Sequence, residues 1–343
     1  MKKNRIKIGI YTCISIIVAV MIVREILDFK YYTHEVTYAS TYGDTLAIIP
    51  ICSKDGICEA FFRVGDDYHM STMIDTGMNI DYLCLSPNDF QYMEKNHLLS
   101  DQWGFTPFSF FYSAISPYGW KNPRKYMVGK LPITKENIHV EYKDNKFMIS
   151  SYGRGTYMNE LRGIPIVQGG DESIMGIHLF LDKIVEFSKK DGELRLHKIV
   201  PDNYKKSVEL KRDTQRFFDF KPDKNKIISY SRYALPVTVN GHVYSFFIDT
   251  GHGGSSIRLP RSEAQYASHE LKEFSVKSIS GKDSIVAQFL LDKEGTVVIR
   301  GKAYRHDVHY TDDYPTKYTI NPFGFFDEDF ILDFKNNKIW FKE

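Results

Sequence analysis

Two short segments of the chain place an aspartate in the same local setting. Asp75 and Asp249 each follow a pair of apolar residues, and each is followed by threonine and glycine. Ionising a carboxyl group at the end of an apolar strand is unfavourable unless hydrogen-bond donors contact it. The nearby glycine lets the backbone turn tightly, which brings backbone N–H groups to the carboxylate. If the two turns face each other, the two carboxylates tend to share one proton.

Such a pair of carboxylates is suited to hydrolysis. A water molecule between them has a base on one side, which takes its proton as it attacks an amide carbonyl, and an acid on the other, which protonates the departing group. The reaction requires no metal ion, cofactor or covalent intermediate. The alternative interpretation is that both aspartates only stabilise turns.

The two aspartates belong to an internal repeat. When the chain is shifted by 174 residues, Met73–Gly77 falls on Phe247–Gly251, and Gln91-Tyr92 falls on Gln265-Tyr266. Self-similarity at a fixed offset indicates two copies of one structural unit. We therefore expect two similar halves, each supplying one aspartate.

Each copy has the pattern strand, turn, strand, Asp-Thr-Gly, helix. The turns are Gly65-Asp66-Asp67 and Asn240-Gly241, and the latter pair is typical of a two-residue hairpin. Proline at the first turn predicts helices over residues 87–98 and 260–274.

The C-terminal parts of the two copies also have similar sequence patterns. An apolar-apolar-Gly triplet is expected in each, Ile174-Met175-Gly176 in the first and Pro322-Phe323-Gly324 in the second, followed by two apolar stretches around a turn. Between the copies, residues 201–226 are rich in Lys and Asp with little periodicity. We interpret them as a linker with no more than one helical turn.

Composition supports a β-rich body. The chain has 343 residues, 43% of them apolar and 15% aromatic, enough for about two domains with sizeable cores. A formal net charge of +2 argues against a dedicated nucleic-acid binder. Four cysteines are too few for a disulfide scaffold; Cys52 and Cys58 could meet across a hairpin or remain free thiols.

The N-terminus predicts a membrane anchor. An uncharged, mostly apolar run covers residues 8–23, preceded by a basic cluster that places the N-terminus in the cytoplasm and the body outside it, in the periplasm or at the cell exterior. The run is slightly short for a bilayer, so a cleaved secretory signal is the alternative. No small-x-small cleavage site closes the run, which favours an uncleaved anchor.

These motifs resemble those of the aspartic protease family, in its retropepsin-like and pepsin-like members. The resemblance spans most of the chain from about residue 44 onward. It implies an all-β, bilobal acid-protease fold, with two pseudo-symmetric β lobes and few short helices, here with an N-terminal transmembrane helix added. The catalytic dyad would be Asp75 and Asp249. The residues that support it would be Thr76, Gly77, Thr250 and Gly251, the two threonines cross-linking the loops through hydroxyl-to-backbone bonds.

The sequence departs from the family at the residue after each glycine, where Ser or Ala is usual and Met78 and His252 stand. A protonated His252 near Asp249 would favour the charged carboxylate and raise activity towards neutral pH. The alternative is that His252 points outward. It is therefore a possible modulator of the dyad.

The family also requires a flap, a hairpin over the cleft. In the first copy, an aromatic stretch that includes Tyr118 and Trp120 has its most turn-like point at residues 116–119. In the second copy, Ser280 and Gly281 lie at a turn. The aromatic side chains could line substrate pockets, form ordinary core, or rest on the bilayer interface.

The sequence thus predicts four segments: a cytoplasmic stub and anchor at residues 1–30, a protease lobe at 31–198, a linker at 199–229 and a second lobe at 230–343. The predicted function is a membrane-anchored aspartic endopeptidase acting on polypeptides, competent as a monomer because both halves lie in one chain. One alternative is a catalytically inactive peptide-binding module of the cell envelope with the same scaffold. Another is a β-rich envelope protein whose two turns coincide by chance. No metal site is expected.

Overall fold

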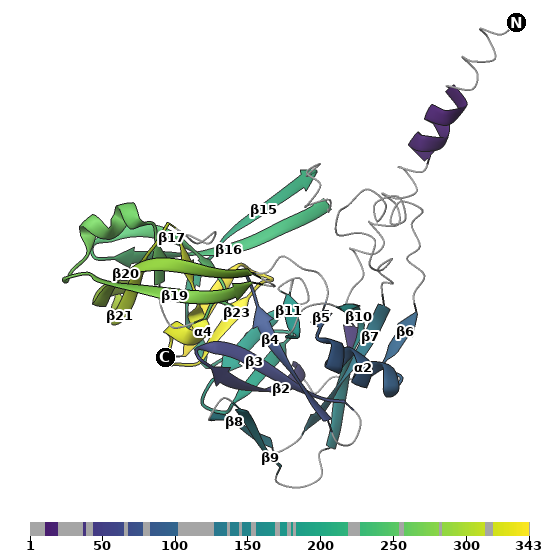
Figure 1. Ribbon diagram of the computed structural model, residues 1–343. Helices are drawn as coiled ribbons and strands as arrows, with labels where there is room; N and C mark the ends of the chain where they lie inside the picture. Colours follow the sequence, from purple (N-terminus) through teal and green to yellow (C-terminus); the bar gives the residue numbers. More distant parts are fainter. Residues whose placement is uncertain are drawn as a thin grey trace, which may run out of the picture.

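The computed structural model shows a mostly β protein (Figure 1). It describes residues 11–19, 37–38, 44–64, 68–77, 83–101, 127–135, 138–143, 146–151, 156–168, 172–176, 180, 183–218, 227–253, 257–280, 283–312 and 318–342.

Within those residues the largest sheet has 14 strands. Its order is β14-β24-β23-β12-β13-β2-β3-β4-β11-β5-β10-β7-β6, and β1 pairs with β10 off this path. The strands are β1 (Thr37–Tyr38), β2 (Thr45–Lys54), β3 (Ile57–Val64), β4 (Tyr68–Asp75), β5 (Leu83–Leu85), β6 (Leu99–Asp101), β7 (Met127–Lys135), β10 (Thr156–Gln168), β11 (Ile174–Gly176), β12 (Ile184–Ser188), β13 (Glu193–His197), β14 (Tyr204–Glu209), β23 (Phe330–Asp333) and β24 (Lys338–Lys342).

The second sheet of the described chain has eight strands in the order β15-β16-β17-β22-β18-β21-β20-β19. They are β15 (Lys211–Phe218), β16 (Ile227–Val239), β17 (His242–Ile248), β18 (Ile257–Leu259), β19 (Lys272–Ser280), β20 (Asp283–Ile299), β21 (Lys302–Tyr310) and β22 (Thr319–Ile320). A separate hairpin pairs β8 (Ile138–Lys143) with β9 (Lys146–Ser151).

The two sheets contain the same five-strand pattern. In the first, β3-β4-β11-β5-β10 pair in turn as antiparallel, parallel, antiparallel and parallel neighbours. In the second, β16-β17-β22-β18-β21 follow the same sequence of pairings. Figure 1 shows the green strands of the second repeat grouped beside the blue and teal strands of the first. The predicted internal duplication is therefore visible as one five-strand pattern that occurs in both sheets.

Side-chain alternation sets the face on which the first aspartate lies. Along β4 the side chains of Met70, Thr72 and Ile74 are buried, while the alternate residues, Asp75 among them, are less so. Because successive residues of a strand point to opposite faces, the buried residues hold the strand to the core and leave Asp75 on the other face. β17 repeats this arrangement with Phe246 and Ile248 buried.

Two tight turns form as the sequence indicates. Asp55-Gly56 and Asn240-Gly241 both have positive φ at each residue, 52° and 82° in the first pair and 49° and 87° in the second. This geometry matches the right-handed twist of a two-residue hairpin and is tolerated best by Asn, Asp and Gly.

The predicted helix after the first Asp-Thr-Gly is present as α2 (Pro87–Lys95). The Ser86 hydroxyl caps it by accepting a hydrogen bond from the N–H of Asp89 at 3.2 Å. The helix ends before residue 98, the predicted limit, because the backbone of His97 is left-handed with φ 56°.

The helix predicted over residues 260–274 is wrong. Only a 3₁₀ helix, η3 (Arg261–Tyr266), forms there, and β19 begins at Lys272. The carboxylate of Asp292 accepts hydrogen bonds from the N–H of Ser268 and from the His269 ring, both at 2.9 Å, so tertiary contacts draw the chain away from a helix. Local propensity is a weak guide where such contacts compete.

The predicted linker also differs, because much of residues 199–229 is strand. β14 pairs with β24, and β15 pairs over its whole length with residues 227–234 of β16. β14 is an edge strand with most of its side chains exposed, so its sequence lacks the alternation of a half-buried strand.

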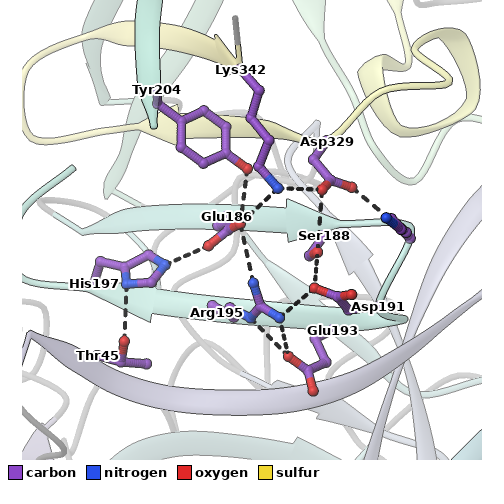
Figure 2. A network of polar contacts seen from close by, with 11 residues as sticks. Thr45, Glu186, Ser188, Asp191, Glu193, Arg195, His197, Tyr204, Asp329 and Lys342 are labelled. Carbon is purple, nitrogen blue, oxygen red and sulfur yellow. Dashed lines mark hydrogen bonds and ion pairs between the residues drawn. The ribbon is translucent and has the colours of Figure 1, made fainter. Parts of the chain in front are cut away.

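Strands from both repeats and from the connecting segment meet in the part of the large sheet ordered β14-β24-β23-β12-β13. Figure 2 shows Glu186 of β12 at the centre of a polar network there. Its carboxylate contacts the His197 ring at 2.7 Å, the Tyr204 hydroxyl at 2.8 Å and the Arg195 guanidinium at 3.3 Å. The network thus ties β12 to β13 and β14.

The cysteines of the β2–β3 hairpin, Cys52 and Cys58, do not form a disulfide. Cys52 pairs with Glu59, and Cys58 pairs with Ser53. Because neighbouring residues on a strand face opposite ways, this register puts Cys52 and Cys58 on opposite faces of the sheet.

The N-terminal run at residues 8–23 is described only over residues 11–19, which are helical. Among the described helices, none combines the length and the apolar character needed to cross a bilayer. The rest of the predicted anchor lies outside the described residues.

Candidate active site

Asp75 is the last residue of β4 and lies beside Gly176 of the parallel strand β11. The buried Ile74 before it fixes the end of the strand in the core. The N–H of Gly77 turns back and donates to Asp75 Oδ1 at 2.8 Å. The first Asp-Thr-Gly is therefore a tight loop that brings a backbone donor to its own carboxylate.

Asp249 occupies the corresponding place in the second repeat. It follows β17 directly, and its N–H donates to the carbonyl oxygen of Ile320 in β22 at 2.9 Å. The N–H of Gly251 donates to Asp249 Oδ1 at 3.2 Å. The two loops thus have the same internal hydrogen bond, with the longer distance in the second.

The two loops face each other at very short range. A Cβ atom placed on Gly77 would lie closer than 3.0 Å to the Asp249 carboxyl group. A Cβ placed on Gly251 would lie equally close to the Asp75 carboxyl group. Each aspartate is therefore seated over the glycine of the opposite loop, and only glycine leaves room for it.

The threonines cross-link the loops, as the resemblance implies. The Thr76 hydroxyl donates to the carbonyl oxygen of Ile248 at 3.1 Å, and the Thr250 hydroxyl donates to that of Ile74 at 2.6 Å. Each hydroxyl also accepts the N–H of the other threonine, at 3.1 and 3.0 Å. Both threonines are buried, so this four-bond lattice fixes the position of one loop relative to the other.

The electrostatics of Asp249 follow from this geometry. Burial, then the charge of Asp75 and a side-chain hydrogen bond to it, raise the pKa of Asp249 to about 7, against the opposing effects of the Gly251 N–H and of Arg258. Two buried carboxyl groups joined by a hydrogen bond hold one proton between them over a wide pH range. The arrangement can accept a proton at one oxygen and release one at another.

His252 is buried and does not point outward. Burial, helped by the nearby Arg258 and His309, lowers the pKa of His252 to about 3. The expectation of a protonated His252 that favours charged Asp249 is therefore wrong, because the ring is neutral where the dyad titrates. Its Nε2 atom has no hydrogen-bond partner among the described residues.

The second closing triplet needs a correction. Pro322-Phe323-Gly324 lies in the short helix α4 (Pro322–Phe325), whereas the strand beside β17 is Thr319–Ile320. Asn321 therefore stands where Gly176 stands in the first repeat. An Asn directly before Pro is a helix-start signal that could have revealed the offset.

Asn321 is fully buried and uses its whole amide. Its Nδ2 donates to the carbonyl oxygens of Gly56 at 2.9 Å and His252 at 2.7 Å. Its Oδ1 accepts the N–H of Gly324 at 3.1 Å. Sequence reasoning missed this residue.

The predicted flap is described only in part. Tyr118, Trp120 and Gly281 lie outside the described residues, as does Met78. Ser280 ends β19 and pairs with Asp283 at the start of β20. The described residues contain no group of three or more His, Cys, Asp or Glu placed to hold a metal ion.

Comparisons with known proteins give weak structural likenesses, two of which are described below. No family model matches the chain, and neither does any curated protein. The chain is similar to the crystal structure of basic 7S globulin from soybean, at 10% identity and a TM-score of 0.45, covering 86% of this chain and 95% of that one. It is also similar to the crystal structure of EDGP, at 8% identity and a TM-score of 0.42, covering 88% and 95%. Scores below 0.5 do not establish a shared fold.

Proposed function

We propose that this chain is an aspartic endopeptidase in which Asp75 and Asp249 activate a water molecule to hydrolyse peptide bonds. The observation that carries the proposal is the hydrogen bond between two half-buried carboxyl groups whose loops are cross-linked by Thr76 and Thr250. If the two aspartates only stabilised their own turns, their carboxyl groups would not need to lie within hydrogen-bonding distance of each other. Two like charges this close destabilise the fold unless they share a proton.

The proposed reaction uses the unequal protonation of the pair. Asp249, whose pKa is raised, is proposed to hold the proton, which leaves Asp75 as the ionised partner. Asp75 takes a proton from the water as its oxygen bonds to the peptide carbonyl carbon, and Asp249 gives its proton to the carbonyl oxygen. The carbon–nitrogen bond of the resulting diol then breaks as Asp75 gives its newly acquired proton to the leaving nitrogen, while one diol hydroxyl returns its proton to Asp249. The pair again holds one shared proton.

We further propose that the substrate is an extended polypeptide bound through its main chain, as a strand is bound at a sheet edge. Tyr118, Trp120, Ser280 and Gly281 are proposed to cover it. His252 is proposed to shape the site as a neutral side chain. These assignments rest on the position of the residues in the sequence.

The membrane anchor is likewise a proposal that rests on residues 8–23 and the basic residues before them. It places the N-terminus in the cytoplasm and residues 31–343 outside it. Protease added to sealed spheroplasts should remove an epitope fused after residue 343 and spare one before residue 1. Protection of the C-terminal epitope would contradict this orientation.

The test of the activity is proteolysis by the full chain in detergent. An unfolded protein substrate should be cleaved between pH 4 and 8, and the cleavage should be abolished by Asp75→Asn, by Asp249→Asn and by a statine inhibitor. Wild-type protein that binds peptides without cleaving them would instead identify the inactive binding module. Full activity of both Asn variants would show that the two turns are structural only.

A further inference from the structure

Asn321 lies where three separate parts of the molecule meet. Its amide contacts the Gly56 carbonyl in the β2–β3 turn, the His252 carbonyl in the loop that carries Asp249, and the first turn of α4. The β2–β3 turn belongs to the first repeat, and the other two belong to the second. One side chain therefore joins the two repeats beside the dyad.

Both polar atoms of this amide are hydrogen-bonded. An Asn side chain offers two N–H donors and an acceptor oxygen, and each has a partner between 2.7 and 3.1 Å. The side chain is completely buried, so water cannot replace a lost bond. A buried carbonyl group that loses its donor destabilises the folded state.

Asn321 contacts the Asp249 loop, whose internal Gly–Asp hydrogen bond is the longer of the two. The Gly251 N–H lies 3.2 Å from Asp249 Oδ1, against 2.8 Å for the matching bond at Asp75. His252 directly follows Gly251, so the bond to the His252 carbonyl restrains the peptide segment that supplies this donor. Gly253, one residue further, lies near Ile57 of the first repeat. A Cβ atom placed on Gly253 would lie 3.8 Å from Ile57 Cδ1.

We propose that Asn321 is a positioning residue of the dyad: by tying the Asp249 loop to the β2–β3 turn, it fixes where the Asp249 carboxyl stands relative to Asp75. The inference rests on the proposed function for its kinetic consequences. The first repeat has Gly176 at the matching position beside Asp75, so this restraint belongs to the second aspartate alone. Thr76 and Thr250 hold the two loops together from the core, and Asn321 holds the second from the side.

The competing explanation is that Asn321 only caps α4. Asn321→Asp separates the two roles, because an Asp side chain of the same shape still accepts the Gly324 N–H but replaces the amide donors with an oxygen. Asn321→Ser is a second variant that adds no charge. Its side chain is too short to reach the carbonyl groups of both Gly56 and His252. The matched control is Asn96→Ser, which removes an amide bond to the Tyr92 carbonyl at the end of α2, away from the dyad.

Kinetics of the full chain should separate positioning from folding. We expect Asn321→Ser and Asn321→Asp to lower kcat about 100-fold with KM within about threefold of wild type, as a misplaced catalytic group does. Weakening the Gly251 donor also raises the pKa of Asp249, so the basic limb of the Asn321→Ser pH–rate profile should move up by about half to one pH unit. Wild-type kcat and an unmoved basic limb, or loss of thermal stability alone, would overturn the proposal.

Hydrogen–deuterium exchange tests the same idea without relying on turnover. Peptides that cover residues 249–253 and 54–58 should exchange faster in Asn321→Ser than in wild type or Asn96→Ser, while the rest of β17 stays protected. Unchanged exchange in both segments would overturn the positioning role. If wild-type protein cleaves nothing, the proposed protease function fails, and this measurement still decides whether Asn321 restrains the loop.

Discussion

Thr76 and Thr250 each hold the backbone of the other. The N–H of Thr76 donates to the Thr250 hydroxyl at 3.1 Å, and the N–H of Thr250 donates to the Thr76 hydroxyl at 3.0 Å. Both hydroxyls then donate onward to the residue before the opposite aspartate. Residues 174 positions apart are thus fixed at hydrogen-bonding distance by two side chains.

Thr250→Val should destabilise the fold. Valine has the shape of threonine without the hydroxyl, so the Ile74 carbonyl and the Thr76 N–H lose their partner while buried. Each unsatisfied group costs about 1–3 kcal/mol, so the free energy of unfolding should fall by about 2–6 kcal/mol in urea titrations. Thr250→Ser keeps the hydroxyl and serves as the control. Equal stability of Thr250→Val and wild type would show that the lattice contributes nothing.

The two loop glycines should tolerate no side chain. A methyl group at Gly77 or Gly251 would occupy the space of the opposite carboxyl, so Gly77→Ala and Gly251→Ala should reduce peptide cleavage at least 100-fold. Gly253→Ala is the matched control, because its methyl meets only the Ile57 side chain at ordinary contact distance. An active Gly77→Ala enzyme would mean that the carboxyls are not packed this closely.

The dyad should titrate near neutrality. Burial and the neighbouring Asp75 raise the pKa of Asp249 to about 7, so cleavage should decline as the pH rises through about 7. In carboxyl-carbon NMR of the full chain, Asp75→Asn should bring the pKa of Asp249 down, since the neighbouring charge is gone. Burial remains, so the value should stay above the ordinary 3.8. An unchanged midpoint in that variant would show that the carboxyls do not interact.

Replacing His252 should leave the shape of the pH–rate profile unaltered. Burial and the nearby Arg258 hold the pKa of His252 at about 3, so the ring is already neutral between pH 4 and 8. His252→Gln therefore changes no charge in that window, and both limbs should superimpose on those of wild type. A shifted limb would show that the ring carries a proton when the dyad works.

Glu186 should make the fold sensitive to acid. Burial alone would raise its pKa, but the hydrogen bonds from His197 and Tyr204 and the charge of Arg195 outweigh burial and lower it below 4.5. A carboxylate with a lowered pKa adds stability above its unfolded pKa and loses it as the pH falls through the folded value.

Glu186→Gln should accordingly be about 1–3 kcal/mol less stable than wild type at pH 7, and the difference should shrink below about pH 4.5. Chemical denaturation at a series of pH values measures both. Glu209→Gln is the control, because the Glu209 side chain is 83% exposed and its contact with Lys338 is screened by solvent. A pH-independent difference for Glu186→Gln would contradict this account.

Features encoded by a few adjacent residues could be predicted from the sequence. The Asp-Thr-Gly loops, the Asn240-Gly241 turn and the start of α2 at Ser86 and Pro87 each depend on local backbone preferences. The repeat offset was equally visible, because both copies kept the residues that a tight loop requires.

Features decided by distant partners could not be predicted. Asp292 redirects residues 267–271, and β24 recruits β14 from the expected linker, although nothing in either segment reveals the partner. The burial of His252 depends on side chains from other strands. The role of Asn321 depends on Gly56, which is far away in the sequence and contributes only its carbonyl group.

The pairing of β12 with β23 has a consequence for synthesis of the protein. β12 is entirely buried, and one of its edges is covered by residues 330–333. While a ribosome is still translating the second repeat, that edge is open on a nascent first repeat, and an open apolar edge is a site for aggregation. Chaperone binding during translation, or rapid completion of the last strands, therefore becomes a requirement for yield. A frameshift that removes β23 and β24 should send the truncated product to degradation.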